Sequence, residues 1–265
     1  MIRFAEPRDT AMVRALWEIC FPDDSGFNDY FFQHHYQPQH TLLLTGDAEL
    51  CAMLQMLPYR LSAAEGKGEI TYIYGACTAP AHRRKGCMAR LLEQSFVLDQ
   101  AAGRAASALI PAEEWLFGFY APFGYRPFFH IDTRIIHRTQ GGTLPQRLTT
   151  ADIPEMDRLY RTHTGGCRIV RKFADWQTQL ALFDTLGKGV YGWFDGAHLT
   201  AYAFCWEDTA QEALGLTAQQ EQGLLLALER ETLSMTSCGQ NRALGCIKWY
   251  GQPPAANGYM NLMFN

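Results

Sequence analysis

The sequence has no long apolar run and is poor in charge. No stretch approaches the roughly 18 apolar residues that a membrane-spanning helix needs. Arg3, Glu6 and Arg8 interrupt the amino-terminal segment, where a signal peptide requires unbroken apolar residues. We therefore expect a cytoplasmic protein with no membrane partner. Charged residues make up 19% of the chain, below the usual fraction of about 25%, which indicates that part of the surface is covered, for example at a domain interface.

An excess of positive charge is also absent. The 265 residues include 23 basic and 27 acidic ones, which gives a net charge of −4. Because proteins that bind nucleic acids usually carry a basic surface, the composition argues against a nucleic-acid partner. The 48% of hydrophobic residues is enough for a buried core and excludes a mainly disordered chain.

The eight cysteines form no C-x-x-C pair and no regular framework. In a cytoplasmic protein such cysteines are expected to be reduced thiols, most of them packed in the interior. His34 and His35 are sequence neighbours, and neighbours on a helix face different directions. The sequence therefore predicts no metal site.

The chain divides into two halves with a similar pattern. Its 265 residues correspond to roughly 1.8 domains at about 150 residues each. The Gly- and Pro-containing segment 140–145 is a linker candidate, which predicts domains at residues 1–140 and 146–265. Each half opens with a strand and a capped helix, and each contains a hairpin signal, Gly46-Asp47 or Asp195-Gly196. Further helices are expected over 28–36, 88–96 and 115–120, and strands over 41–45, 50–57, 70–78, 105–110 and 128–134.

One segment carries a chemical pattern, residues 72–92 (YIYGACTAPAHRRKGCMARLL). An apolar strand runs to Pro80, a basic turn follows, and a helix begins near Cys87. The first N–H groups of a helix are unpaired and the helix dipole is positive at that end, while Gly86 lets a ligand approach the main chain. The pattern predicts a cradle for a pyrophosphate; the alternative is a solvated basic turn. The P-loop pattern G-x-x-x-x-G-K-[ST] and the dinucleotide pattern G-x-G-x-x-G are absent.

This segment resembles motif A of the GCN5-related N-acetyltransferases (GNATs), [RQ]-x-x-G-x-[GA], which binds the pyrophosphate of acetyl-coenzyme A. The match is Arg83-x-x-Gly86-x-Met88, with methionine in place of the last small residue. The P-x-H-R-R-K-G turn followed by a larger apolar residue is similar to the branch of enhanced intracellular survival (Eis-like) acetyltransferases. Residues 119–125 (FYAPFGY) resemble the family's F-Y-x-x-[FL]-G-[FY] segment.

The resemblance implies an α/β (α+β) fold of two tandem GNAT-like units, each a mixed, mostly antiparallel sheet flanked by helices. The first unit would carry the catalysis, and the second would be degenerate, shape the substrate cleft and bind no cofactor. A faint second motif A, Gln220-x-x-Gly223, lacks a preceding strand and a flanking basic residue, and the leucine spacing there predicts a helix. The sterol-carrier-like domain of longer relatives is not expected in a chain of this length.

The resemblance also implies direct transfer of an acetyl group from acetyl-coenzyme A to a primary amine. Tyr120 matches the general acid, since a phenol with a pKa of about 10 stays protonated at neutral pH and can protonate the leaving thiolate; the alternative is an aromatic core residue. Cys77 and Cys87 would flank the cofactor without acting as nucleophiles. The implied contacts to coenzyme A lie at the end of the strand, in the turn and in the first helical turn, namely at Ala76, Cys77, Thr78, Arg83, Arg84, Lys85, Gly86, Cys87, Met88 and Ala89.

The general base is open at this point. In Eis-like enzymes the carboxyl terminus enters the active site, and the apolar segment 259–265 makes the α-carboxylate of Asn265 the corresponding candidate; the alternative is a packed or frayed terminus. Glu113, Glu114 and water are the rival bases.

These features predict an acetyl-coenzyme A-dependent N-acetyltransferase that acts on an amine of a small molecule or peptide. The alternative is a non-catalytic acyl-coenzyme A-binding sensor, in which Tyr120 is structural. The sequence leaves open the acceptor amine, the oligomeric state and any ligand of the second unit.

Overall fold

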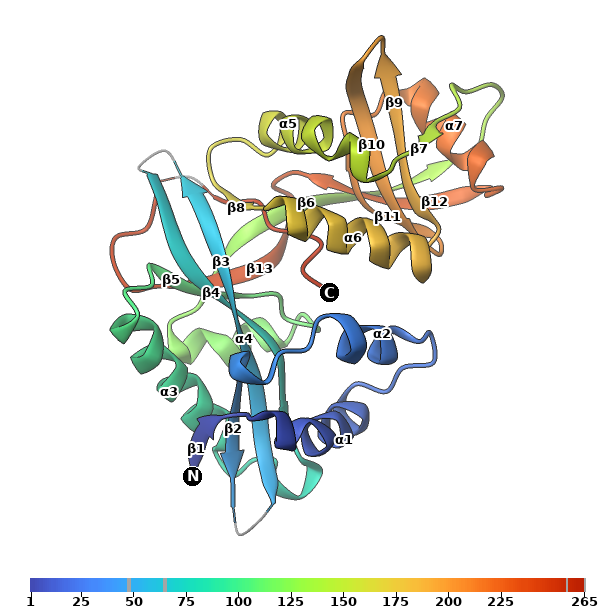
Figure 1. Ribbon diagram of the computed structural model, residues 1–265. Coiled ribbons are helices and arrows are strands. Elements are labelled where there is room, and N and C mark those ends of the chain that lie inside the picture. Colours follow the sequence, from blue (N-terminus) through green and yellow to red (C-terminus); the bar gives the residue numbers. More distant parts are fainter. Residues whose placement is uncertain (47–48, 64–65, 256, 265) are drawn as a thin grey trace. The chain divides into compact units, whose positions relative to one another are not determined.

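The computed structural model describes residues 1–46, 49–63, 66–255 and 257–264 (Figure 1). By internal contacts the chain divides into two compact units. The first comprises Met1–Leu61, Lys67–Arg126 and Gly245–Pro253, and the second comprises Ser62–Gly66, Pro127–Leu244 and Pro254–Asn265. The limits of the functional domains at 1–140 and 146–265 stay a prediction.

The first unit is a mixed sheet in the order β1-β2-β3-β4-β5-β13. Antiparallel pairing joins β1 to β2, β2 to β3 and β5 to β13, whereas β4 and β5 are parallel. The strands are β1 (Ile2–Phe4), β2 (Thr41–Thr45), β3 (Leu50–Ala63), β4 (Gly66–Thr78), β5 (Ala106–Leu109) and β13 (Arg242–Trp249).

Helices cover both faces of this sheet (Figure 1). They are α1 (Thr10–Cys20), α2 (Phe27–His34), α3 (Cys87–Ala101) and α4 (Leu116–Tyr120). Leu43 of β2 packs in one cluster with Trp17 of α1 and Phe31 of α2, whereas its neighbours Leu42 and Leu44 pack in another with Leu91 of α3. Successive side chains of a strand point to opposite faces, so the uninterrupted apolar run of β2 reflects a strand that is covered on both sides.

The second unit repeats this construction in the order β6-β12-β11-β10-β9-β7. Antiparallel pairing joins β6 to β12, β11 to β10, β10 to β9 and β9 to β7, and β11 and β12 are parallel. The helices are α5 (Ile153–His163), α6 (Phe173–Thr185) and α7 (Ala218–Ala227). The strands are β6 (Arg126–His137), β7 (Gln146–Arg147), β8 (Arg168–Val170), β9 (Gly189–Asp195), β10 (His198–Trp206), β11 (Thr209–Leu214) and β12 (Thr232–Cys238).

The two units share one order of pairings. In each unit an antiparallel hairpin, β2-β3 or β9-β10, is followed by a further strand, β4 or β11. A helix, α3 or α7, then connects that strand to its parallel neighbour, β5 or β12. An antiparallel strand then closes the sheet, and it is β13 in the first unit and β6 in the second. The predicted α/β (α+β) class with mixed, mostly antiparallel sheets is confirmed.

Most predicted elements are present with shifted ends. The hairpin at Asp195-Gly196 joins β9 to β10, and a helix, α7, stands where the faint second motif A lies. Strands β2 and β3 also pair as a hairpin, but Asp47 of its turn lies outside the described residues. The strand-like segment at 259–265 is wrong as a strand: only Gly258 and Tyr259 form isolated bridges, and the buried residues that follow are irregular. No described helix is long and apolar enough to cross a membrane.

Candidate active site

The last part of β4 runs beyond its parallel neighbour. The described pairing joins β4 to β5 at Ile70–Tyr72, and β4 continues to Thr78. Gly75 has a φ of 56°, and a Cβ at this position would overlap the ring of Trp17, so only glycine fits. The described pairing with β5 therefore does not reach the last residues of β4.

A compact turn connects this strand end to α3. Pro80–His82 form a 3-10 turn, and Arg84 and Gly86 have φ values of 61° and 75°. Gly86 is the N-cap of α3, makes no side-chain cap, and has no atom within 4 Å of the position of a Cβ. The first N–H groups of α3 thus have no side-chain cap and lie at the positive end of the helix dipole, which is the arrangement that binds phosphate groups.

The turn also carries exposed positive charge. Arg83, Arg84 and Lys85 are exposed, and none of them takes part in an ion pair with the described residues of the chain. The Nε of Arg83 donates to the carbonyl oxygen of Thr78 at 3.2 Å, which ties the turn to the strand end. Exposed cations beside unpaired N–H groups favour a multiply charged anion.

The corresponding helix of the second unit is closed by its own side chains. Thr217 caps α7, accepting from the N–H of Gln220, while the Gln220 side chain accepts from the N–H of Thr217. This capping box fills the N–H groups that α3 leaves open. The two helices therefore differ at their N-termini: side chains cap α7, whereas α3 has no side-chain cap.

The structure brings Tyr120 into the same apolar cluster as the start of α3. Tyr120 is 8% exposed and belongs to the cluster that contains Cys87, and the half-buried Ala76 and Met88 pack against this cluster. Burial and the neighbouring Cys246 raise the pKa of Tyr120 to about 12. The phenol is therefore protonated throughout the physiological pH range, as a general acid must be.

The side chains of the predicted coenzyme A contacts do not all face the same side. Cys77 packs in the cluster of α1 and α2, whereas Cys87 packs in the cluster of α3 and Tyr120. The thiol of Cys77 therefore lies on the opposite face of the sheet from Cys87 and α3. Only the backbone of Cys77 can contribute to a site on the α3 face. Arg84, Lys85, Gly86 and the first residues of α3 form one continuous surface because they are adjacent in the chain.

Of the three residues considered as the general base, the structure describes two, Glu113 and Glu114. Glu113 and Glu114 are exposed, and their backbone carbonyls accept from the N–H groups of Leu116 and Phe117 at the start of α4. Asn265 lies outside the described residues. The segment that precedes it is buried in the second unit from Tyr259 to Met263.

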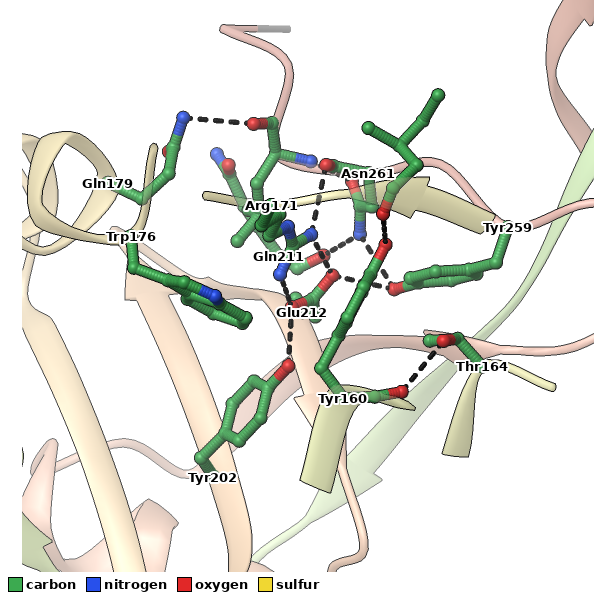
Figure 2. Close-up of polar contacts among 12 residues, drawn as sticks. Tyr160, Thr164, Arg171, Trp176, Gln179, Tyr202, Gln211, Glu212, Tyr259 and Asn261 are labelled. Carbon is green, nitrogen blue, oxygen red and sulfur yellow. Dashed lines mark hydrogen bonds and ion pairs between the residues drawn. The ribbon is translucent and has the colours of Figure 1, made fainter. Parts of the chain in front are cut away.

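A cluster of buried polar side chains holds the segment from Tyr259 to Met263 within the second unit (Figure 2). Glu212 of β11 accepts two hydrogen bonds from Arg171, at 2.6 and 2.7 Å, and one each from the hydroxyls of Tyr202 and Tyr259, at 2.8 and 2.9 Å. Arg171 also donates to the carbonyl oxygen of Asn261 at 3.1 Å. Both charged side chains are almost completely buried, and their hydrogen bonds join them to one another, to tyrosine hydroxyls and to the backbone. We interpret this cluster as a structural anchor, because both carboxylate oxygens of Glu212 are already hydrogen-bonded within the protein.

Sequence reasoning did not single out Cys20 or Cys246. Cys20 lies at the end of α1 and contacts the turn that leads to α3, because its Sγ lies 3.7 Å from the carbonyl oxygen of Thr78. Cys246 of β13 lies near Tyr120 in the structure, although it follows Tyr120 by 126 residues in the sequence. No local sequence pattern marks either cysteine, because the contacts of both are with residues that are distant in the sequence.

A family model matches the part of the chain that builds this site. Residues 1–128 match the acetyltransferase (GNAT) domain family. The matched range holds β1 to β5, the turn before α3, and Tyr120. No curated protein matches the sequence.

Solved structures share the fold at low sequence identity. A conserved protein from Enterococcus faecalis, described as a probable N-acyltransferase, is 13% identical with a TM-score of 0.71 and covers 98% of this chain and 71% of its own. A GCN5-related N-acetyltransferase from Anabaena variabilis is 16% identical, with a TM-score of 0.71 and coverage of 93% and 72%. Eis1 from Mycobacterium abscessus is 12% identical, with a TM-score of 0.63 and coverage of 94% and 73%. The chain is therefore similar in fold to these acetyltransferases, and the GNAT domain match covers the turn before α3.

Proposed function

We propose that the first unit binds acetyl-coenzyme A and transfers its acetyl group directly to a primary amine of a small molecule or peptide. The observation that carries this proposal is the N-terminus of α3, which has no side-chain cap and follows directly on three exposed cations, Arg83, Arg84 and Lys85, and the end of β4. The GNAT domain match over residues 1–128 supports it. The similarity in fold to Eis1 and the shared order of pairings in the two units support an Eis-like tandem arrangement, in which the second unit binds no cofactor.

In this proposal the chain positions both ends of the coenzyme. Arg84, Lys85 and the N–H groups of Gly86–Ala89 hold the pyrophosphate, and Arg83 keeps the turn against the strand end. The backbone of Ala76–Thr78 pairs with the pantetheine arm, and an N–H group near Cys77 or Thr78 stabilises the oxyanion of the transition state. When bound, acetyl-coenzyme A supplies the acetyl thioester.

Tyr120 supplies the proton for the departing thiolate of coenzyme A. Its burial keeps the hydroxyl protonated, and transfer from a positioned acid accelerates such steps by about 10²–10⁴-fold. The acceptor ammonium must lose a proton before it attacks. For that step the carboxylate of Asn265, Glu113, Glu114 and water remain the candidates.

The test is an assay of thiol release. The full chain is incubated with acetyl-coenzyme A and a panel of amines that includes aminoglycosides, polyamines and lysine peptides, and mass spectrometry identifies the acetylated product. We expect at least one amine to give stoichiometric release of coenzyme A and acetyl-amine. Binding of acetyl-coenzyme A without turnover on any amine would instead favour the acyl-coenzyme A sensor.

A substitution at the N-cap of α3 tests the cradle by itself. We expect Gly86→Asp to weaken the affinity for coenzyme A by about tenfold or more, because its carboxylate accepts the first N–H groups of α3 and repels the pyrophosphate. Isothermal titration calorimetry measures the Kd.

Gly103→Asp is the matched control. Gly103 follows the other end of α3, has a φ of 68° and likewise has no atom within 4 Å of a Cβ position. It therefore incurs a similar backbone strain and adds the same charge far from the proposed cradle. Equal affinities of the two variants would contradict the placement of the pyrophosphate at Gly86.

A further inference from the structure

Two cysteine side chains meet beside the turn that leads to α3. Cys20 lies at the carboxyl end of α1 and is half-buried, whereas Cys77 lies in β4 and is buried. Cys20 packs against the apolar cluster that contains Cys77, and the two side chains interact with one another. The Nη2 of Arg83 lies 4.0 Å from the same sulfur, and the carbonyl oxygen of Thr78 lies 3.7 Å from it. All four residues belong to the first unit.

This arrangement gives the two sulfurs different chemical roles. The contact with Cys77 and the charge of Arg83 lower the pKa of Cys20 to about 6, whereas burial and the neighbouring Cys20 raise the pKa of Cys77 well above its usual value. The shared contact therefore favours loss of the proton from Cys20 over its loss from Cys77. A partly exposed thiolate in contact with a second thiol is the arrangement found in oxidisable cysteine pairs.

None of the other six cysteines has these properties together. Cys51, Cys87, Cys167, Cys205 and Cys246 are buried. Cys238 is half-buried like Cys20, but burial and the carboxylates of Glu212 and Asp132 raise its pKa. Cys238 is therefore a matched control of similar exposure and opposite electrostatics.

We propose that Cys20 and Cys77 form an oxidisable dithiol, which hydrogen peroxide converts to a disulfide, and that this disulfide weakens the binding of coenzyme A at the adjacent turn. In the first step the thiolate of Cys20 attacks one peroxide oxygen; an S–O bond forms, the O–O bond breaks and hydroxide leaves. In the second step the sulfur of Cys77 attacks the sulfenic acid of Cys20; the S–S bond forms, the S–O bond breaks, and the proton of Cys77 leaves with the hydroxyl group as water. Two thiols are oxidised and one peroxide is reduced to two waters.

The disulfide changes the strand end on which the proposed cofactor site depends. An S–S bond is about 2.05 Å long, so the sulfurs of these two free cysteines must approach one another to form it. Because β4 carries Cys77 next to Thr78, this movement displaces the backbone proposed to pair with pantetheine. The effect on coenzyme A rests on the proposed function, but the formation of the disulfide does not.

The first experiment maps the modification without any activity assay. The full chain is treated with a small molar excess of hydrogen peroxide and then with N-ethylmaleimide, and its peptides are analysed by mass spectrometry without reduction. We expect a peptide pair linked through Cys20 and Cys77 as the main product, and its loss in the Cys20→Ser variant but not in Cys238→Ser. In the Cys77→Ala variant we expect a dimedone adduct on Cys20, because its sulfenic acid then has no resolving thiol. A chain in which Cys20 stays reduced, or in which Cys20 and Cys238 are oxidised equally, overturns the proposed dithiol.

Alkylation provides an independent measure of the contact with Arg83. At pH 7 iodoacetamide is expected to label Cys20 about fivefold faster than Cys238, and Arg83→Gln is expected to reduce that difference. Equal rates for the two cysteines in the native chain would contradict the proposed environment of Cys20.

The second experiment measures the Kd of coenzyme A before and after oxidation. We expect about a tenfold loss of affinity in the oxidised chain, recovery with dithiothreitol, and no loss in peroxide-treated Cys20→Ser. Equal affinity of the reduced chain and of the mapped disulfide form overturns the regulatory effect while the dithiol stands. Absence of coenzyme A binding in the reduced chain overturns the proposed function, and the peptide map then decides the dithiol alone.

Discussion

The Tyr120→Phe variant is expected to lose about a hundredfold or more in kcat while its Kd for coenzyme A stays within about twofold. The substitution removes only the hydroxyl, so the ring keeps its packing against Phe119 and Tyr125. If Tyr120 delivers the proton to the leaving thiolate, the loss is confined to the step that breaks the thioester. Steady-state kinetics on the amine found by the panel, together with calorimetry, separates the two quantities.

The pH dependence of the native chain provides a second test of the same role. Because the pKa of Tyr120 is raised to about 12, the hydroxyl keeps its proton below that pH. We therefore expect no fall in kcat up to about pH 10 from loss of the acid. A descending limb centred near pH 8 or 9 that disappears in Tyr120→Phe would contradict the raised pKa.

Tyr125→Phe is the matched control. Tyr125 is 1% exposed and its hydroxyl lies 2.7 Å from the Oγ of Ser107, so the variant loses a buried hydrogen bond of about 1 kcal/mol. It is expected to be slightly less stable and to keep its kcat. If Tyr120→Phe behaves like Tyr125→Phe, then Tyr120 is a core residue and the proton comes from elsewhere.

The parts of the fold and site that the sequence predicts are those set by local chain geometry. The turn before α3, with its Pro80, its cations and Gly86, is encoded within a dozen residues, because a glycine N-cap and a helix start are decided by neighbouring residues. The hairpin at Asp195-Gly196 follows from the same kind of local rule. These features appear in the structure close to their predicted positions.

The parts that the sequence does not predict depend on pairings between distant segments. Nothing local shows that β13 closes the first sheet and β6 the second, and this pairing brings Cys246 next to Tyr120. The contact between Cys20 and Cys77 likewise joins the end of a helix to a strand 57 positions later. The register of a strand and its long-range partners are determined by side-chain packing across the whole face of a sheet. A single sequence does not show which segments pack together in this way.

Glu212 is the clearest example of a residue whose role local pattern hides. A glutamate in a strand is normally expected to face water, yet Glu212 is fully buried, and its cation partner Arg171 lies 41 positions earlier. Aromatic rings of Tyr160 and Trp176 enclose the guanidinium at 4.2 and 4.7 Å. The chain thus places both charges inside the second unit and satisfies them with one another and with tyrosine hydroxyls (Figure 2).

Glu212→Gln is expected to destabilise the protein by about 3–5 kcal/mol. The variant keeps the shape of the side chain but leaves the buried guanidinium of Arg171 without a counter-charge, and an uncompensated buried charge costs about that much. Urea denaturation followed by tryptophan fluorescence measures the change. Glu231→Gln is the control: its ion pair with Arg138 is 3.1 Å long and its side chain is 81% exposed, so the loss should stay below about 1 kcal/mol.

The same substitution should loosen the segment from Tyr259 to Met263 before the whole unit unfolds. Two of the hydrogen bonds that hold this segment depend on the ion pair: the bond from Arg171 to the carbonyl of Asn261 and the bond from the hydroxyl of Tyr259 to Glu212. The others are the bond from Gln179 to the carbonyl of Leu262 at 2.9 Å, the bond from the Nδ2 of Asn261 to the carbonyl of Gln211 at 2.6 Å, and the backbone bonds of Tyr259. Limited proteolysis should therefore cleave Glu212→Gln in this segment at protease levels that leave Glu231→Gln intact. A resistant segment in a destabilised variant would show that the remaining hydrogen bonds and apolar packing suffice to hold it. A double variant, Arg171→Met with Glu212→Leu, should recover stability relative to Glu212→Gln, because it removes the unpaired charge, yet leave the segment sensitive, because the bond to Asn261 is lost.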